Sequence, residues 1–218
     1  MPNWCYNTLT IRGDKETVLG LIERASTGEH DYVGPFSRRG REDMDWGTFT
    51  PVQMELLMGD DDLFRDKSEV KSIFSFHAFV PVPREVMLAP YDPNSLREVK
   101  AKYPEWFDRF PNLIAGYDWE HKEWGVKWGA REASINEQYE DTNGDQVVVY
   151  SFDTAWGPPT EFMHKLAALY PTLSFQLSFR EEGMGFEGDY SWWDGECTEM
   201  DDRDCEQEDD DEEDGEEE

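Results

Sequence analysis

The sequence is poor in cysteine, in positive charge and in long apolar runs, and each shortage argues against a class of protein. Its three cysteines, Cys5, Cys197 and Cys205, are an odd number without a CxxC pair, which disfavours a disulfide framework and a zinc knuckle. No apolar run approaches the ~20 residues that span a bilayer, and the N-terminus lacks the basic and apolar regions of a signal peptide. We therefore expect a cytoplasmic protein with reduced thiols and no membrane contact.

Positive charge is the scarcest of these features. The chain has 20 Lys and Arg against 50 Asp and Glu, a net charge of −30. Residues 201–218 hold 14 acidic side chains and one Arg, or −13, which leaves −17 on residues 1–200. Such an end repels itself and has little to bury, so we expect a disordered acidic tail over 200–218. Nucleic acid is an unfavoured partner because its binding depends on cations, whereas a basic protein is a favoured one.

Motifs of common enzymes and metal sites are also missing. The sequence has no P-loop, no GxSxG and no dinucleotide-binding GxGxxG motif, and its four histidines lack HxH or HExxH spacing. Asp141, Asn143 and Asp145 begin like a calcium loop, but Gln146 stands where that loop needs Gly and Phe152 where it needs Glu. We expect no metal and no cofactor. The Asn-Gly pair in this segment instead predicts a hairpin turn at 141–145.

The clearest pattern that is present is a strand–helix–strand unit between residues 146 and 180. Residues 146–154 are rich in β-branched and aromatic side chains, which pack well on a pleated sheet. After a Pro-Pro pair that suits a helix entrance, apolar residues recur at i, i+4 and i+7, which indicates one buried stripe. Residues 173–180 alternate between apolar and polar side chains, which is typical of a strand buried on one face. The helical stripe consists of Phe162, Leu166 and Leu169.

The remaining elements are shorter. In chain order they are a strand at 3–12, a helix from Lys15 to about Ser26, a short helix at 51–58, a strand at 72–80, two or three short helices in 84–128, a strand leading to the hairpin, and a glycine-rich edge strand at 184–193. Helices on one face of a mainly antiparallel sheet define an α+β sandwich, and its simplest form is ferredoxin-like. We predict one such domain over 1–199, with insertions at 27–70 and 84–128.

Four short motifs resemble a known family. They are Asn3–Asn7, Phe76–Pro83, Trp124–Ala130 and Phe152–Pro159. In this order they are similar to motifs of the uncharacterised YubB-like proteins of bacteriophages and plasmids, which carry a ferredoxin-like domain. The resemblance covers roughly residues 3–193, without most of 27–70 and without the tail. It implies the fold and an origin on a mobile element, but it transfers no catalytic residue.

Polar groups interleaved with tryptophan are the candidate functional residues. The candidates for a binding groove are Asn3, Trp4, Asn7, Lys127, Trp128 and Trp156. His77, His121 and Asp153 are weak catalytic candidates, because a His near a carboxylate can act as a general acid or base. The alternative is structural: Trp4, Trp124, Trp128 and Trp156 form a cap on the core, and the Asn and Asp side chains bind loop backbone. A small basic cluster in the first insertion, Arg38, Arg39 and Arg41, either binds phosphate or pairs with the acidic body.

Three functions are compatible with these residues. We favour a non-enzymatic accessory protein of a phage or plasmid that binds a basic host or phage protein through its acidic surface and tail. The second hypothesis is an enzyme of unknown type that uses the Trp-lined groove. The third is a nucleic-acid-binding ferredoxin-like module, against which the charge of the body argues. No feature of the sequence specifies an oligomeric state.

Overall fold

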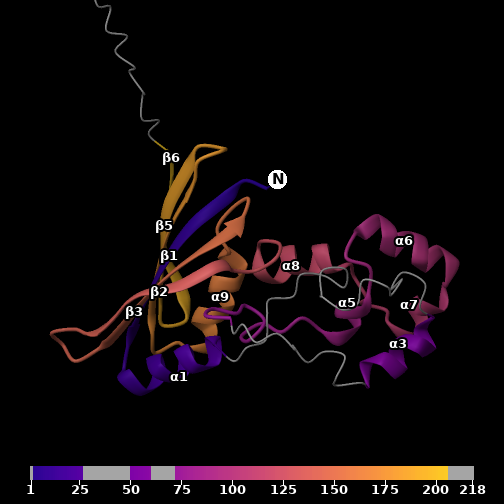
Figure 1. The fold of residues 1–218 in the computed structure, drawn as a ribbon, viewed down its shortest axis with the longest axis horizontal. Helices are drawn as coiled ribbons and strands as arrows, with labels where there is room; N and C mark the ends of the chain where they lie inside the picture. Colours follow the sequence, from indigo (N-terminus) through magenta and orange to yellow (C-terminus); the bar gives the residue numbers. More distant parts are fainter. Residues whose placement is uncertain (1, 27–49, 60–71, 206–218) are drawn as a thin grey trace, which may run out of the picture.

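The computed structural model describes residues 2–26, 50–59 and 72–205. In this part of the chain, six strands form one antiparallel sheet in the order β2-β3-β1-β4-β5-β6 (Figure 1). The strands are β1 (Trp4–Gly13), β2 (Arg131–Glu140), β3 (Gln146–Ala155), β4 (Ser174–Glu181), β5 (Phe186–Trp193) and β6 (Glu196–Asp204). The helices are α1 (Lys15–Ala25), α3 (Pro51–Met58), α5 (Arg84–Leu88), α6 (Pro93–Lys102), α7 (Glu105–Arg109), α8 (Gly116–Trp124) and α9 (Thr160–Leu169).

Four strands have the ferredoxin-like connection. Strand β1 is antiparallel to both β3 and β4 and lies between them, so β3 and β4 run in the same direction. The chain passes through β1, α1, β2, β3, α9 and β4, which is the βαββαβ order of this fold. The β5–β6 hairpin then extends the sheet beyond β4. This arrangement confirms the predicted ferredoxin-like antiparallel sheet.

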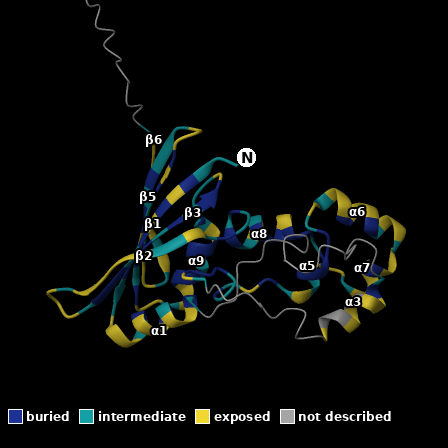
Figure 2. Cartoon of the chain, viewed as in Figure 1, coloured by how far each residue is buried: buried dark blue, intermediate teal, exposed yellow. Residues whose placement is uncertain are grey.

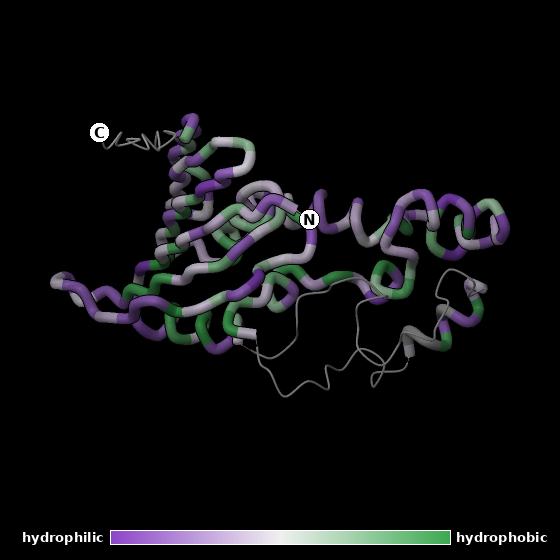
Figure 3. Tube along the Cα trace, turned by 45° about the horizontal axis from the view of Figure 1, so that its top comes forward, coloured by the Kyte–Doolittle hydropathy of each residue, from purple (hydrophilic) through white to green (hydrophobic). Residues whose placement is uncertain are grey.

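The main core lies between one face of the sheet and helices α1 and α9. Along β1, Cys5, Leu9 and Ile11 are buried while Tyr6 and Thr8 are exposed, because successive side chains of a strand point to opposite faces. The buried residues of the two helices complete this core: Val18, Leu21, Ala25, Phe162, Met163, Leu166 and Ala167. Figure 2 shows how buried and exposed residues are distributed along the chain, and Figure 3 shows the same for apolar and polar residues. Helices on one face were expected, and this is what the structure has.

The prediction of a strand at 72–80 is wrong. This segment consists of bends and a turn, in which the Phe79 and Val80 amides both donate to the Phe76 carbonyl. Phe74 and Phe76 are fully buried in the helix layer, and the Phe76 ring stacks on Phe162 at 3.8 Å between centroids. The alternating apolar residues therefore fill the space on the helical side of the sheet instead of joining the sheet. Apolar and polar residues alternate at the start of this segment because Phe74 and Phe76 pack into the core, although the segment is not a strand.

The C-terminal prediction also needs correction. The strand at 184–193 is present as β5, but it is not at the edge, because β6 pairs with it on the outer side. The two strands are joined at Asp194 and Gly195, which have φ of 55° and 78°, the positive values that a tight hairpin turn requires. Ordered structure thus extends past Glu199, where we expected the tail to begin. The rest of the predicted tail, residues 206–218, lies outside the described residues.

The two predicted insertions meet in one helical lobe, which consists of α3, α5, α6 and α7 and lies to one side of the sheet (Figure 1). Helix α3 confirms the short helix expected at 51–58, and Glu55 of this helix forms an ion pair with Arg109 of α7. Residues 84–128 contain four helices, α5 to α8, instead of two or three. A second, smaller core holds this lobe together: Leu88, Ala89, Leu96, Val99, Trp106, Leu113 and Ala115. The basic cluster at 38–41 lies outside the described residues.

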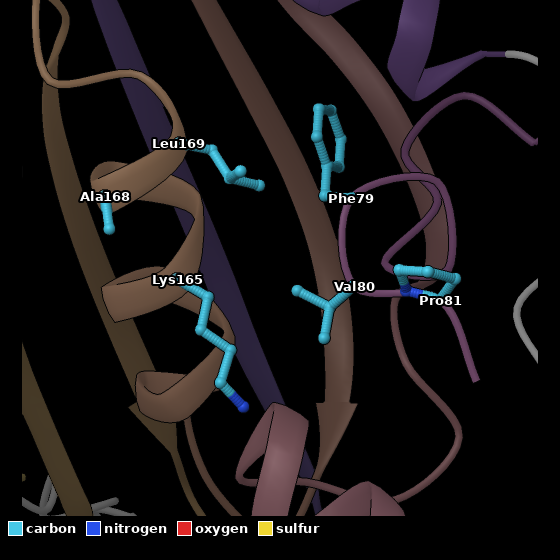
Figure 4. A pocket seen from close by; sticks show the side chains of 6 residues that line it. All are labelled: Phe79, Val80, Pro81, Lys165, Ala168 and Leu169. Atoms are coloured by element: carbon cyan, nitrogen blue, oxygen red, sulfur yellow. The ribbon is translucent and has the colours of Figure 1, made fainter. Parts of the chain in front are cut away.

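The predicted stripe of α9 is correct for Phe162 and Leu166 but wrong for Leu169, which is 48% exposed. Leu169 and Phe79 line opposite sides of a shallow apolar hollow on the outer side of α9 (Figure 4). The one charged side chain there, Lys165, donates to the Glu123 carbonyl at 2.7 Å and to its carboxylate at 2.5 Å. This hollow therefore offers apolar surface and an ammonium group that is already engaged.

Candidate functional site: an aromatic–cation cluster

A buried carboxylate organises the loop that precedes β2. Glu120 of α8 is fully buried, and its Oε2 accepts a hydrogen bond from the Tyr91 hydroxyl at 2.6 Å and one from the Trp128 amide at 3.0 Å. Helix α8 ends at Gly125, whose φ of 80° turns the chain back towards the sheet. Hydrogen bonds to a buried carboxylate are strong and costly to break. Glu120 therefore fixes the backbone on which Lys127 and Trp128 stand.

A second backbone contact fixes the end of β3. The Trp156 amide donates to the Asn3 carbonyl at 3.0 Å, which ties the residue after β3 to the residue before β1. Trp128 and Trp156 have φ of 71° and 74°, values that are rare for bulky side chains and persist only where surrounding contacts impose them. The backbone that carries both indoles is thus held by contacts of the fold.

Three tryptophans and two cations meet at this end of the sheet. We call Trp4, Lys127, Trp128, Arg131 and Trp156 the aromatic–cation cluster. The Trp4 and Trp128 ring centroids are 6.3 Å apart. The Lys127 ammonium lies 4.0 Å from the centroid of Trp128 and 5.8 Å from that of Trp156, and the Arg131 guanidinium lies 5.9 Å from that of Trp4. These are cation–π distances, so the cations cap the aromatic surface.

The cluster keeps an exposed aromatic face and unneutralised charge. Trp156 is 45% exposed. Among the residues that the structure describes, no carboxylate lies within 4.0 Å of the Lys127 ammonium or the Arg131 guanidinium. Asp153 is the cross-strand partner of Arg131, and its partial burial and the charge of Glu132 raise its pKa. The cluster therefore presents aromatic surface and two positive charges on a strongly acidic protein.

The structure brings most of the predicted binding residues together. Trp4, Lys127, Trp128 and Trp156 contact one another as described, and Asn3 adjoins them through its carbonyl. Asn7 is not part of the cluster, since it points to the helical side of the sheet and is 2% exposed. Its amide donates to the carbonyls of two strands and to a threonine hydroxyl, namely those of Cys5, Phe152 and Thr154. Asn7 is a core residue whose polar group is satisfied internally.

One further residue shows what sequence reasoning missed. Arg131 was not among the candidates, although it begins the strand that follows Lys127 and Trp128. Its short distance in sequence from Lys127 and Trp128 was the one available signal. The contact of Arg131 with Trp4 arises only when β2 pairs with β3 in the folded sheet. The alternative of a tryptophan cap on the core applies to Trp124, which is fully buried and donates its indole N–H to the Val80 carbonyl. It does not apply to Trp156, which is exposed.

The structure does not assemble the three catalytic candidates. His77 belongs to the segment packed on the helical side of the sheet, and its Nδ1 accepts a hydrogen bond from the Val82 amide at 3.1 Å. Asp153 follows the buried Phe152 along β3 and therefore points to the opposite face. His121 lies on α8, with Nδ1 2.9 Å from the Tyr117 carbonyl oxygen. The hypothesis of an acid–base pair between His77 and Asp153 thus loses its geometric basis.

The outer strand β6 is the second candidate surface. It is the last strand of the sheet, and its acidic side chains are exposed: Glu196, Glu199, Asp201, Asp202 and Asp204. We call these five side chains the acidic edge. Arg203 is the basic residue of the strand, and it is bound by Glu187 and Asp189 of β5, both at 2.9 Å. The Ser178 hydroxyl and Arg203 hold the pKa of Asp189 below its usual range.

Within the described ranges, no three His, Cys, Asp or Glu side chains are grouped so as to hold a metal ion. None of the helices in these ranges is long and apolar enough to cross a membrane.

Comparisons with known proteins agree with this fold. Residues 123–218 match the family model described as a ferredoxin-like domain in Api92-like protein. The crystal structure of the protein Api92 from Yersinia pseudotuberculosis superposes with a TM-score of 0.53 over 95% of this chain and 99% of that chain, at 13% sequence identity. At this identity the likeness shows the fold alone. None of the curated proteins matches the chain. The protein thus has a ferredoxin-like α+β fold, and residues 123–218 are similar to the domain of Api92-like proteins.

Proposed function

We propose that the protein is a non-enzymatic binding protein, which holds a basic host or phage protein against its acidic edge and tail. The observation that carries this proposal is the exposure of five carboxylates along a strand that ends the sheet. Of the 13 residues that follow, 206–218, 11 are Asp or Glu. The acidic edge and these residues follow one another in the chain, and both are rich in negative charge.

Electrostatics explains the choice of partner. A surface with one sign of charge attracts the opposite sign over about one Debye length, ~8 Å at physiological salt, and repels a second copy of itself. Charged side chains also prevent an edge strand from pairing with unrelated strands. A partner must therefore bring cations to the surface, and its affinity will fall as salt rises.

The setting of this binding is part of the same proposal. The four motifs that resemble YubB-like proteins support an origin on a phage or plasmid. Action in the host cytoplasm is part of this proposal. In this setting an acidic surface competes for sites on host proteins that are built to bind phosphate.

Affinity capture tests the proposal directly. The full chain, a variant with all five carboxylates of the acidic edge changed to amides, and a chain that ends at Cys205 are used to capture proteins from a bacterial lysate at low salt. We expect basic proteins on the full chain, fewer on each altered chain, and release from all of them near 0.5 M salt. A purified captured protein is then titrated against each chain by calorimetry to obtain Kd.

A matched variant controls for charge alone. Glu98, Glu105 and Glu137 are exposed carboxylates on α6, α7 and β2, away from the acidic edge. Changing them to Gln should leave capture intact. If this variant loses the partner to the same degree as the edge variant, overall charge and not the acidic edge determines binding. Capture of a partner that neither salt nor either altered chain removes would refute the proposal.

A further inference from the structure

The aromatic–cation cluster calls for a different ligand from the acidic edge. It combines an exposed indole, Trp156, with two cations that have no carboxylate partner within 4.0 Å among the described residues. We propose that the cluster binds a nucleotide, with its base stacked on Trp156 and its phosphate held by Lys127 and Arg131. This inference does not depend on the proposed function, because the two surfaces share no residue.

The exposed indole of Trp156 is the reason to expect a flat ring in the ligand. Trp156 has a φ of 74°, its backbone amide is bound to the Asn3 carbonyl, and its side chain is 45% exposed. A flat base covers such a face, and stacking of a base on an aromatic side chain is worth about 1–3 kcal/mol. This range corresponds to a loss of about 5- to 150-fold in affinity when the ring is removed.

The two cations are the reason to expect a phosphate group in the ligand. The Lys127 ammonium lies near both Trp128 and Trp156, at 4.0 and 5.8 Å from their centroids, so a phosphate attached to a base on Trp156 comes within its reach. Arg131 adds a planar guanidinium, the group best suited to bind two phosphate oxygens at once. Glu120 keeps Lys127 and Trp128 in place through the Trp128 amide. The site is thus formed before the ligand arrives.

Neighbouring carboxylates limit both the affinity and the length of the ligand. Asp153 lies opposite Arg131 in the register of β2 and β3, and Glu132 follows Arg131 in β2. Their charges weaken the phosphate contact, so Asp153→Asn should tighten binding about 2- to 5-fold. A long polyanion would also meet the net charge of −30. A free mononucleotide and one unit of a short single strand share the chemistry that the cluster recognises, and experiment separates them.

Calorimetric titration of the full chain at low salt tests this inference. The probes are AMP, a pentanucleotide of deoxythymidine and inorganic phosphate. We expect saturable binding of AMP, of the pentanucleotide or of both, and weaker binding of phosphate. Trp156→Ala should weaken nucleotide binding about 10-fold, and the double change Lys127→Gln, Arg131→Gln should weaken it at least 5-fold. Binding of AMP alone assigns a free nucleotide as ligand, and binding of the strand alone assigns a strand end.

Two matched controls isolate the cluster. Trp193 is 61% exposed at the far end of β5, and Lys122 is an exposed lysine of α8 bound to Glu123 at 3.0 Å. Trp193→Ala and Lys122→Gln should leave the Kd unchanged. Circular dichroism shows whether each variant is folded, and the surface charges at Lys127 and Arg131 offer a second variant if Trp156→Ala unfolds. Absence of binding at 10 mM AMP and 1 mM pentanucleotide overturns the proposal, as does binding that Trp156→Ala and the double change both leave unaltered.

Discussion

The sheet domain and the helical lobe of this protein are held together in opposite ways. The main core joins residues that are distant in the chain, such as Leu9 of β1, Phe76 and Phe162. The core of the lobe is local, since its members lie between Leu88 and Ala115. A core built from distant segments loses all its parts together, whereas a local core can open by itself. The two regions should therefore differ in cooperativity as well as in size.

Helix α8 connects the two regions. Ala115, directly before α8, packs in the lobe core, while Trp119 and Trp124 of the helix pack in the main core. The Glu120 carboxylate lies on the same helix and reaches Tyr91 in the segment between α5 and α6. Opening of the lobe should therefore stop at α8 and leave the sheet intact. Four substitutions test this difference.

The largest effect is expected from Phe162→Ala. The Phe162 ring stacks on Phe76 and contacts Phe74 edge-on at 6.0 Å. Its removal leaves a cavity in the main core, and we expect the free energy of unfolding to fall by about 3–5 kcal/mol in one cooperative transition. Urea denaturation followed by circular dichroism measures this. Leu169→Ala, on the same helix but half exposed, should cost about 1 kcal/mol or less, and equal losses at both positions would contradict our account of α9.

Trp106→Ala should destabilise the lobe alone. Trp106 is fully buried in the lobe core, and its loss should cost about 3 kcal/mol. Amide hydrogen exchange should then accelerate over residues 93–113 and stay slow in β1 and β3. Within the described residues the Trp106 indole N–H has no hydrogen-bond acceptor, so Trp106→Phe, which keeps a ring and removes the donor, should cost much less. Equal acceleration in the sheet would mean that the two cores unfold as one.

Tyr91→Phe should weaken the connection between the regions. It removes the hydroxyl that donates to the buried Glu120 carboxylate at 2.6 Å, and a lost bond to a buried charged group costs about 1.5–3 kcal/mol. We expect a lower thermal midpoint and a changed NMR signal of the Trp128 amide, which shares the same oxygen. Tyr117→Phe is a matched control, because Tyr117 contacts Tyr91 through its ring and is 39% exposed. An unchanged Trp128 signal would contradict the role given to Glu120.

The smallest effect concerns pH at the contact of α8 with α9. The Lys165 ammonium donates to Glu123 and holds the pKa of that carboxyl below its usual range. A lowered folded pKa means that the stabilisation is present above the unfolded pKa and is lost as pH falls through the folded one. Lys165→Met should therefore cost about 0.5–1 kcal/mol at pH 7 and less at pH 2, where only the bond of Lys165 to the Glu123 carbonyl is lost. Urea denaturation at both pH values measures this, and a loss independent of pH would assign the effect to packing.

The local sequence pattern was enough to predict those helices and strands whose apolar residues are also the buried ones. The strands β1, β3 and β4, the helices α1 and α9, and the turn at Asn143 could all be predicted, because each has a repeat of two or 3.6 residues or a turn pair. Prediction was wrong where apolar residues serve a different contact. Phe74 and Phe76 alternate like a strand but pack between β3 and α9, against Phe152 and Phe162. Leu169 continues a helical stripe, but it is 48% exposed.

The acidic strand β6 shows a further reason for failure. The charge of residues 200–218 suggested disorder, and β6 extends into this range as far as Asp204. The Asp194-Gly195 turn and the pairing of Arg203 with Glu187 and Asp189 supply the register and part of the missing counter-charge. Asp202 also accepts the Tyr190 hydroxyl at 2.5 Å. These contacts exist only once β5 is in place, so the strand could not be found from its own composition.

By itself, the sequence determined the ferredoxin-like class, the acidity and the tryptophans of the candidate site, because periodicity and charge are local properties. Only the tertiary structure decided which candidates meet. It gathered Trp4, Trp128 and Trp156 with Arg131, sent Asn7 into the core, and placed His77 and Asp153 on opposite faces of the sheet. The physical reason is that successive side chains of a strand point to opposite faces of the sheet. The pairing of distant strands then determines which residues lie together on one face.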